Sequence, residues 1–403
     1  MTIQDLWHLL DHEYDAGKEL LSPLELRGYR VAIDFHNQMY ACRAVVRSSL
    51  IYSRNIVTHP LNEEEIDTLW LQELTRRILG MMCNGITPVL VIDGPAPEEK
   101  ANTREERAAA KQKIIQRIQA EMSRDLLREG REVLREVRKL MLQLNYIPQN
   151  SVEQAIHFFG ELGIQVLQSN TDGERLCSSL CIEGYVAAVL STDSDNLAHG
   201  APVILRGWGP EIPGDGNGGQ SMNYYRVVRL PYILQRMRIS NASFLDFCIL
   251  CGCDYNKRVR GIGAKKGLAL IMKHGNLEEV VGAIAPRDTT ALNFERCRAL
   301  YEKVPSSQLL KEGQTLHWEV RAPDGKYLHD LLSNYGVTHL WDKIVNTFQQ
   351  LPPARNFNHF RRDLMNFDGQ MVEVVTASHN VLNVVVMQQQ GETSQFQDEV
   401  AGE

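Results

Sequence analysis

Three aspartates each follow a short apolar run, although the runs lie far apart in the chain. The runs and their aspartates are residues 30–33 with Asp34, residues 88–92 with Asp93, and residues 185–190 with Asp193. Continuous apolar runs of this length are typical of buried parallel strands, whose carboxyl ends meet at one edge of a sheet. We therefore expect these three carboxylates to be neighbours.

Four more acids extend this group: Asp172 and Glu174 after a weaker apolar run at 164–167, then Asp195, and finally Asp254. Seven carboxylates in one place would raise one another's pKa and destabilise the fold. Hard divalent cations such as Mg²⁺ prefer oxygen ligands and neutralise that charge. Two such ions, ~3.5–4 Å apart, can stabilise both the attacking and the leaving oxygen of a phosphoryl displacement. No serine, cysteine or histidine nucleophile is then needed.

Each acid also has an ordinary structural explanation. A single aspartate after a strand is commonly a turn residue or a helix N-cap. Asp172 and Glu174 could cap and begin a helix over residues 174–182. The set as a whole, rather than any one member, predicts a metal site.

Basic residues concentrate in two segments of a chain whose formal net charge is -7. Residues 100–139 hold twelve basic and seven acidic side chains with one glycine and no proline, which is typical of a helix. Apolar residues are sparse from 100 to 113, so that part is not expected to be buried. Residues 257–273 hold six basic and no acidic side chains. Phosphate binding is compatible with the negative total because net charge averages over different surfaces.

The composition is that of a folded protein in an aqueous compartment. The 403 residues are 43% hydrophobic and 23% charged, which excludes a disordered, collagen-like or membrane-bundle chain. No apolar run reaches the ~18–20 residues that cross a bilayer, and the start lacks a secretory signal pattern. Strands alternating with helical segments predict an α/β fold. We also predict a flexible loop at Gly207–Gly219 and a hairpin within 371–387.

The eight cysteines do not form a disulfide scaffold pattern in a chain of this length, so we expect a reducing, intracellular compartment. Cys248, Cys251 and Cys253 have a spacing that suggests zinc, but no second pair or histidine cluster accompanies them. They are better explained, like Cys177 and Cys181, as buried helical positions.

Longer patterns extend in order over most of the chain. The N-terminal patterns are Ile3-Gln4-x-Leu6-Trp7, Gly28-x-Arg30-Val31-Ala32-Ile33-Asp34, Asn84-Gly85-Ile86-x-Pro88-Val89 and Asp93-Gly94-x-x-Pro97. The internal patterns are Gly163-Ile164, Asp172-x-Glu174, Asp193-x-Asp195, Gly200-x-Pro202-Val203, Leu250-x-Gly252-x-Asp254-Tyr255 and Arg260-Gly261-Ile262-Gly263-x-Lys265. Over roughly residues 1–350, the sequence resembles the flap endonuclease/XPG (Rad2-like) family of structure-specific 5′ nucleases.

The resemblance implies an α/β, PIN-like 5′-nuclease fold with a mostly parallel central sheet, a helical arch insertion and a helix-hairpin-helix element. The implied divisions are an N-terminal nuclease region (1–99), the arch (100–150), an internal nuclease region (151–255), a helix-hairpin-helix duplex-binding region (256–350) and a divergent, partly disordered C-terminal extension (351–403).

The resemblance also implies roles in catalysis. The family's metal ligands fall on Asp34, Asp93, Asp172, Glu174, Asp193, Asp195 and Asp254. The implied cofactor is a pair of Mg²⁺ ions, for which Mn²⁺ can substitute. The family's catalytic lysine and arginine fall on Lys100 and Arg107, which lie two helical turns apart and therefore share a face. The structural alternative is that Lys100 and Arg107 lie on a solvated helix face and have no catalytic role.

Contacts to DNA are implied at two places. Tyr40 falls where a tyrosine stacks on a base at the duplex junction, and Arg47 is expected on the same helix face near phosphates. The residues of the helix-hairpin-helix element expected to bind a duplex phosphate are Arg260, Gly261, Gly263, Lys265 and Lys266. The family's element commonly also binds a monovalent cation. A core tyrosine and an ordinary turn between helices are the structural alternatives.

The sequence departs from the family's pattern at several positions. Thr2 replaces the glycine that usually follows the initiator methionine. Asp172 stands where glutamate is usual, so its shorter carboxylate could bind metal through water. No glutamine-led, double-aromatic box occurs near the C-terminus, so binding to a sliding clamp is not supported. The insertion at Ser49–Asp67 and the extension after 350 would suit a copy encoded by a large DNA virus.

We therefore expect a Mg²⁺-dependent DNA endonuclease that cleaves 5′ flaps or single-strand/double-strand junctions in replication, repair or recombination. The expected partner is branched or flapped DNA. The protein is expected to be a monomer without membrane association, in the nucleus or, for a viral copy, the host nucleus. Alternatives with the same site are a 5′→3′ exonuclease, a Holliday-junction resolvase and an RNA-directed nuclease. A non-cutting scaffold for branched DNA is the alternative from another class.

Overall fold

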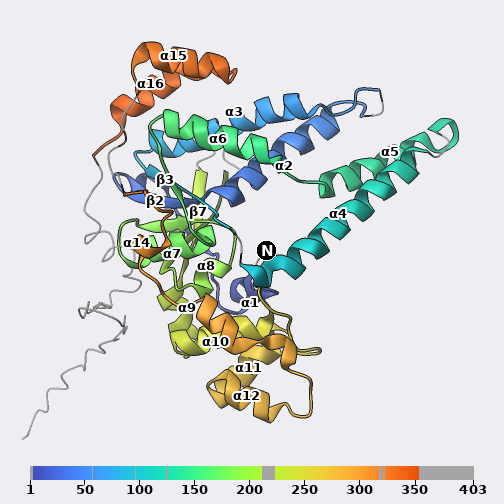
Figure 1. The fold of residues 1–403 in the computed structure, drawn as a ribbon, viewed down its shortest axis with the longest axis vertical. Coiled ribbons are helices and arrows are strands. Elements are labelled where there is room, and N and C mark those ends of the chain that lie inside the picture. Colours follow the sequence, from blue (N-terminus) through green and yellow to red (C-terminus); the bar gives the residue numbers. More distant parts are fainter. Residues whose placement is uncertain are drawn as a thin grey trace, which may run out of the picture. The chain divides into compact units, whose positions relative to one another are not determined.

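A mixed sheet forms the centre of the computed structural model (Figure 1). The structure describes residues 3–353 except 57, 96, 124–125, 211–222, 317–319 and 321–322. Thr2, most of the predicted Gly207–Gly219 loop and the predicted hairpin within 371–387 therefore lie outside the described residues. The described residues belong to one compact unit.

The described strands form a seven-stranded sheet in the order β1-β7-β6-β5-β2-β3-β4. Their bounds are β1 Glu19–Leu21, β2 Arg30–Asp34, β3 Thr87–Ile92, β4 Gln165–Gln168, β5 Ala188–Leu190, β6 Val203–Pro210 and β7 Asn223–Arg229. The strands from β6 to β4 in this order are parallel to one another, whereas β7 and β1 are antiparallel additions at one edge. The predicted mostly parallel α/β sheet is confirmed.

The parallel strands were easier to predict than the edge. The runs at 30–33, 88–92 and 164–167 are strands, but only the last half of 185–190 is one. The predicted loop starts too early, because β6 continues through Pro210 with a register shift between Arg206 and Trp208. That shift falls at Gly207, whose φ of 68° favours glycine.

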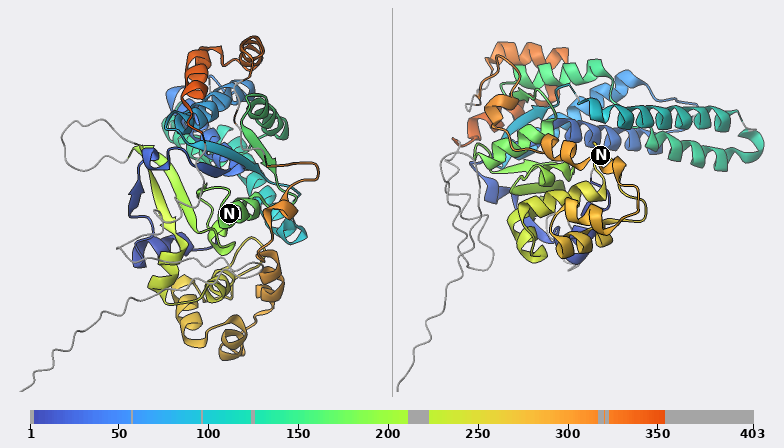
Figure 2. Two further views of the ribbon diagram at one scale, coloured as in Figure 1. Left: turned by 90° about the vertical axis from the view of Figure 1, so that its left-hand side faces the viewer. Right: turned by 60° about the horizontal axis from the view of Figure 1, so that its bottom comes forward.

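Helices cover both faces of the sheet (Figure 2). The bounds are α1 Leu6–Glu13, α2 Phe35–Ser53, α3 Glu63–Cys83, α4 Ala101–Met122, α5 Leu126–Gln143, α6 Gln149–Glu161, α7 Gly173–Ile182, α8 Asp195–Ala198, α9 Leu230–Met237, α10 Asn241–Cys251, α11 Ala264–His274, α12 Leu277–Ala283, α13 Phe294–Leu300, α14 Ser306–Leu309, α15 Gly325–Asn334 and α16 Trp341–Gln350. Short 3₁₀ turns are η1 Pro23–Leu26, η2 Glu98–Lys100, η3 Thr290–Leu292 and η4 Thr338–Leu340. Helices α2, α3 and α6 pack near β2, β3 and β4, and α7 contacts β2, β3 and β5. None of the described helices has the length and apolarity to cross a membrane.

Residues 100–139, predicted as helix, form the paired helices α4 and α5, which lie side by side (Figures 1 and 2). Val133 and Val137 of α5 pack with Ile56, beyond the end of α2. Arg104 to Lys113 of α4 are exposed, as their shortage of apolar residues predicts. The pair is therefore anchored along α5, while the start of α4 is left with an exposed charged surface.

Helices α10 and α11 form a second helical pair, joined by residues 252–263. Gly252 and Gly261 have φ values of 91° and 80°, a backbone conformation that other residues rarely adopt. The two helices contact each other, and Gly263 precedes α11 as its N-cap residue. Two contacting helices joined at these glycines occupy the place of the predicted helix-hairpin-helix element, and the predicted bounds of that region, 256–350, stay a prediction.

Candidate active site

Six of the seven predicted metal ligands line one pocket of about 250 Å³ at the carboxyl ends of the parallel strands. They are Asp34, Asp93, Asp172, Glu174, Asp193 and Asp254. The other lining residues are His36, Asn37, Tyr40, Gly94, Lys100, Arg104 and Arg107. The parallel register of β2 with β3 and β5 brings these distant chain segments together. Six carboxylates thus share the pocket with three lysine or arginine side chains.

Asp34 is fixed between the end of β2 and the start of α2. Its Oδ1 accepts a hydrogen bond from the Asn37 backbone N–H at 3.1 Å, and its Oδ2 accepts one from the Ser191 hydroxyl at 2.8 Å. Asp34 therefore caps the N-terminus of α2, as the structural alternative predicted, and also lines the pocket. Burial, followed by the charge of Asp93, raises the pKa of Asp34 to about 7.

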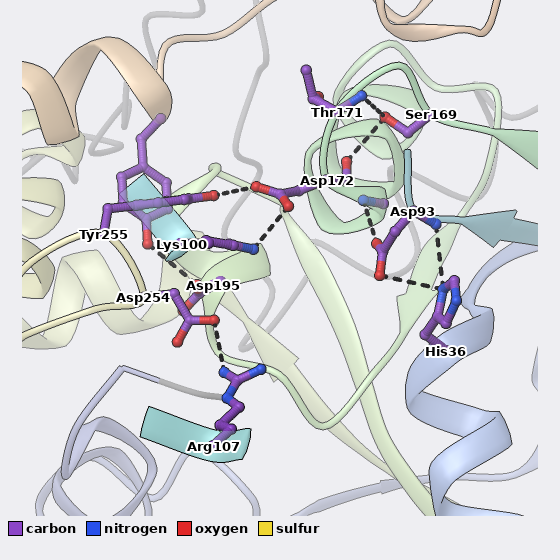
Figure 3. A network of polar contacts seen from close by, with 12 residues as sticks. His36, Asp93, Lys100, Arg107, Ser169, Thr171, Asp172, Asp195, Asp254 and Tyr255 are labelled. Carbon is purple, nitrogen blue, oxygen red and sulfur yellow. Dashed lines mark hydrogen bonds and ion pairs between the residues drawn. The ribbon is translucent and has the colours of Figure 1, made fainter. Parts of the chain in front are cut away.

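Asp93 joins the end of β3 to the first turn of α7. Its Oδ1 accepts a hydrogen bond from the Gly173 backbone N–H at 2.7 Å, and its Oδ2 lies 3.3 Å from His36 Nδ1 (Figure 3). A Cβ atom at residue 173 would lie 2.7 Å from that Oδ1, so a larger residue there would displace the Asp93 carboxylate. The contact holds the start of α7, which carries two further acids, against the pocket.

Asp172 is the N-cap residue of α7, but its side chain makes no capping hydrogen bond. Its Oδ1 accepts a hydrogen bond from Lys100 Nζ at 2.8 Å, and its Oδ2 accepts one from the Tyr255 hydroxyl at 2.5 Å (Figure 3). The side-chain capping alternative is thus wrong for Asp172. Glu174 lies in the first turn of the same helix, where burial and then the charge of Asp93 raise its pKa well above the usual range.

Asp193 lies at the surface of the pocket, whereas Asp195 is buried below it. Asp193 lines the pocket, and burial raises its pKa above the ordinary value. Asp195 begins α8 beneath it, is 3% exposed, and accepts a hydrogen bond at Oδ2 from the Tyr301 hydroxyl at 3.3 Å. Its buried Oδ1 has no hydrogen-bond partner among the residues that the structure describes. Burial and then the charge of Asp193 raise the pKa of Asp195 well above its usual range.

Lys100 and Arg107 both reach the pocket, one from η2 and one from α4. Burial alone would lower the pKa of Lys100, but the charges of Glu174 and Asp172 outweigh it and raise the pKa. Lys100 is therefore charged at neutral pH although its side chain is largely buried. It does not lie on a solvated helix face, which was the structural alternative for this residue. Arg107 is half exposed, and its Nη2 donates a hydrogen bond to Asp254 Oδ2 at 3.1 Å (Figure 3).

The donor chemistry fits hard divalent cations. In the described part of the chain, no three histidine, cysteine, aspartate or glutamate side chains are arranged as a finished ion cage. Nevertheless, the pocket is lined by carboxylates in excess of its cations, and Asp195 Oδ1 is a buried oxygen without a partner. Oxygen ligands of this kind suit Mg²⁺, which keeps several waters and so needs few direct protein ligands.

The two residues predicted to hold the duplex junction lie in different surroundings. Tyr40 is 45% exposed and lines the pocket, so it is not a core tyrosine. Arg47 is 5% exposed, and its Nη1 donates a hydrogen bond to Glu63 Oε1 at 3.1 Å. Arg47 is thus bound within the protein, and its expected position near phosphates stays a prediction. The first turn of α3 covers that part of α2 and pairs Glu63 with both Arg43 and Arg47.

The five residues predicted to bind a duplex phosphate gather at the start of α11. Arg260, Lys265 and Lys266 are exposed, while Gly261 and Gly263 shape the turn before the helix. Lys265 Nζ lies 2.6 Å from Glu13 Oε1 of α1, and both side chains remain solvent-accessible. The turn thus presents three cations, and the contact with DNA stays a prediction.

Several residues that line the pocket or bind its carboxylates were not identified from the sequence. Arg104 lies between Lys100 and Arg107 at helical spacing, and His36 follows Asp34 by two residues, so proximity to recognised positions could have identified both. Tyr255 directly follows Asp254, but its contact with Asp172 joins distant segments. Tyr301 offers no local signal, because its contact with Asp195 depends entirely on the fold.

Comparisons with known proteins agree with this arrangement. The XPG N-terminal domain matches residues 1–114, and the XPG I-region matches residues 163–254. Flap endonuclease 1 of Ovis aries is 30% identical over 334 residues, which are 80% of this chain and 76% of that protein. Flap endonuclease 1 of Cryptosporidium muris (strain RN66) is 29% identical over 263 residues, which are 64% of this chain and 52% of that protein.

A solved structure shares the fold. Flap endonuclease-1 from Methanococcus jannaschii superposes with a TM-score of 0.54 at 23% identity, over 83% of this chain and 97% of that chain. The two matched regions together contain all seven predicted carboxylates as well as Lys100 and Arg107. The chain therefore belongs to the flap endonuclease/XPG family of structure-specific 5′ nucleases.

Proposed function

We propose that this nuclease is a divalent-metal-dependent DNA endonuclease that hydrolyses phosphodiester bonds near single-strand/double-strand junctions, with 5′ flaps as its preferred substrate. The observation that carries the proposal is the pocket in which six carboxylates from distant segments face three cations. Family membership supports work in DNA replication and repair. We further propose that the protein acts as a monomer in the nucleus.

The carboxylates of the pocket would hold two Mg²⁺ ions, or Mn²⁺ in their place, with Asp195 acting from the level beneath. When bound, the ions supply charge stabilisation for the phosphoryl group and a strong nucleophile from water. The raised pKa values of Asp34, Glu174 and Asp193 support this role, because crowded buried carboxylates need positive charge to ionise together.

Cationic side chains would draw the scissile phosphodiester into the pocket. Lys100 remains charged in a buried position, and Arg107 adds a half-exposed guanidinium from the next turns of the chain. In the transition state, both would stabilise charge on the phosphoryl oxygens. The structure adds Arg104 to this pair, because it lines the same pocket.

The DNA on either side of the cleaved bond would contact different elements. Tyr40 is exposed beside the pocket, where its ring could stack on a base at the junction, a contact worth ~1–3 kcal/mol. The duplex would extend to Lys265 and Lys266 at the start of α11, and the single strand would run along the basic surface of α4. A monovalent cation at the α10–α11 turn belongs to the same proposal.

The direct test is a cleavage assay on labelled 5′-flap, nicked, four-way and RNA substrates with and without Mg²⁺. We expect cleavage of the 5′ flap that requires Mg²⁺ and stops with a chelator. Preferred cleavage of the four-way junction or of RNA would replace the proposed substrate. Cleavage of the flap in the presence of chelator would remove the metal site from the mechanism.

The substitution Asp193→Ala tests the carboxylates. We expect cleavage to fall by at least ~10²-fold, since the charge stabilisation that depends on these ligands is worth several kcal/mol. Binding of flap DNA should remain. Asp342→Ala, an exposed acid of α16, is the matched control and should cleave like the wild type. Equal turnover by the two variants would end the assignment.

The substitution Lys100→Ala tests the handling of the phosphate. We expect the single-turnover cleavage rate to fall ~10²–10³-fold, as when a single donor to transition-state charge is removed. The dissociation constant for DNA should change far less. Lys343→Ala removes an exposed lysine of α16, outside the proposed DNA-binding surface, and serves as the control. A defect confined to DNA binding would reduce Lys100 to a surface contact.

A further inference from the structure

Three aromatic rings form a buried stack beneath the pocket. The rings of Tyr255 and Tyr301 meet edge to face with centroids 5.3 Å apart, and the ring of His199 lies 4.7 Å from that of Tyr301. All three side chains are buried. The stack joins three distant segments, namely the loop after α10, the end of α13 and the end of α8. Aromatic stacking of this kind fixes ring orientation and, with it, the direction of each hydroxyl.

Each tyrosine hydroxyl is directed at one carboxylate of the site. Tyr255 donates to Asp172 Oδ2 at 2.5 Å, and Tyr301 donates to Asp195 Oδ2 at 3.3 Å. Because a tyrosine hydroxyl donates one hydrogen bond, each contact fixes one carboxylate oxygen and leaves the second to other partners.

The second oxygens of the two aspartates have different partners. Asp172 Oδ1 accepts from Lys100, whose Nζ also lies 5.2 Å from the centroid of the Tyr255 ring. Asp195 Oδ1 is buried and has no partner in the part of the chain that the structure describes. The hydroxyls therefore hold the aspartates in place without filling every position at which a cation could be bound.

We propose that Tyr255 and Tyr301 are positioning residues that hold Asp172 and Asp195 in the orientation required to bind divalent cations. The inference rests on the proposed metal-dependent function. The tyrosines do not touch the substrate or the cations, and they act through the two carboxylates. The stack with His199 couples the two hydroxyls, so that both carboxylates are oriented by one rigid group.

The test is the binding of Mn²⁺ alone to the full-length protein, measured by the loss of the free-ion electron paramagnetic resonance signal. Tyr255→Phe and Tyr301→Phe each remove one hydroxyl and keep the ring. Loss of a residue that orients a metal ligand typically weakens metal binding ~10–100-fold. We expect this range for Tyr255→Phe and a loss near its lower end for Tyr301→Phe, whose hydrogen bond is longer.

Tyr225→Phe is the matched control, because Tyr225 is a fully buried tyrosine of β7 outside the pocket. It should bind Mn²⁺ like the wild type. This result would show that losing a buried tyrosine hydroxyl does not by itself weaken Mn²⁺ binding. In an Asp172→Ala background, Tyr255→Phe should cause no further loss, since the carboxylate it orients is gone.

The outcomes distinguish the inference from the function on which it rests. If the wild type does not bind Mn²⁺, the proposed metal site itself fails. If the wild type binds Mn²⁺ and either tyrosine variant matches Tyr225→Phe, the positioning role is overturned while the proposed function stands. Thermal melting of each variant shows that it is folded, and a change in melting temperature alone would not reproduce the expected loss of Mn²⁺ affinity.

Discussion

Two groups of acidic side chains in the described part of the chain differ in how their charge is balanced. In the cluster formed by Asp246, Glu278 and Arg298, one guanidinium donates hydrogen bonds to both carboxylates. In the pocket, six carboxylates face three cations. The first arrangement ties helices α10, α12 and α13 together, whereas in the second the carboxylates outnumber the lysine and arginine side chains among the described residues.

The difference is visible in the pKa values of the two sites. The hydrogen bond from Arg298 lowers the pKa of Glu278 to about 2, whereas burial and the charge of Asp93 raise the pKa of Asp34 to about 7. Ionisation of Glu278 therefore stabilises the folded state, whereas ionisation of Asp34 destabilises it. A carboxylate whose pKa is lowered by a partner stabilises the fold when ionised, whereas buried carboxylates that raise one another's pKa favour the binding of an external cation.

The largest expected effect on stability comes from Arg298→Ala. Asp246 is buried, so the substitution would leave its carboxylate without the guanidinium that binds it. Removing one partner of such a pair typically costs ~3–5 kcal/mol. Denaturant unfolding measures the change. Arg296→Ala on the same helix, which breaks a more exposed pair with Glu99, should cost less than ~1 kcal/mol. Equal losses would contradict the assigned difference between buried and exposed pairs.

A smaller effect of opposite sign is expected when Ca²⁺ is added to the wild type. A ligand that binds only the folded state at 100 times its dissociation constant adds ~2.7 kcal/mol of stability. Thermal melting should show this gain for the wild type and a reduced gain for Asp34→Asn, which lacks one carboxylate of the pocket. An unchanged gain in Asp34→Asn would mean that Ca²⁺ binds elsewhere.

The pH dependence of stability in the presence of chelator tests the same contrast between the two sites. Asp34 has an ordinary pKa of 3.8 and a folded pKa of about 7, so the folded state holds the proton more tightly. Its contribution is present below about pH 4 and is lost as the pH rises to about 7. Glu278 acts in the opposite direction, because its contribution is lost as the pH falls from 4.5 towards about 2.

Urea unfolding at a series of pH values measures both contributions. Asp34→Asn should flatten the dependence between pH 4 and 7, and Glu278→Gln should flatten it below pH 4.5. If Asp34→Asn retained the wild-type slope, the buried carboxylate would not be the source of the pH effect.

The sequence contained enough information to predict the centre of the site. Asp34, Asp93 and Asp193 follow buried strands, and parallel pairing alone brings the ends of such strands together. The antiparallel edge of β1, β6 and β7 was not predicted, because its pairing depends on contacts between distant segments. Periodicity identifies a strand or a helix, but it does not identify the partner across the sheet.

The surroundings of Arg47 were not predicted for the same reason. Helical spacing correctly relates Arg47 to Tyr40 on α2, but it contains no information on what packs over each turn. Glu63 of α3 binds Arg47, while Tyr40 remains exposed. The contacts of Tyr255 and Tyr301 were likewise beyond reach, since each joins residues more than 80 positions apart.

The paired helices α4 and α5 are attached to the body at both of their ends. At the start of α4, Arg107 binds Asp254, and Glu106 lies 2.7 Å from Lys257. Beyond the end of α5, the side chain of Asn145 donates a hydrogen bond to the backbone carbonyl of Tyr40. Insertions or deletions at either attachment would therefore shift a pocket residue, and those near Val133 and Val137 would disturb the packing of α5 on Ile56. Changes of length in the part of the pair away from these contacts would leave the pocket residues in place. Variation in the size of this insertion among related nucleases is then expected to be confined to its span.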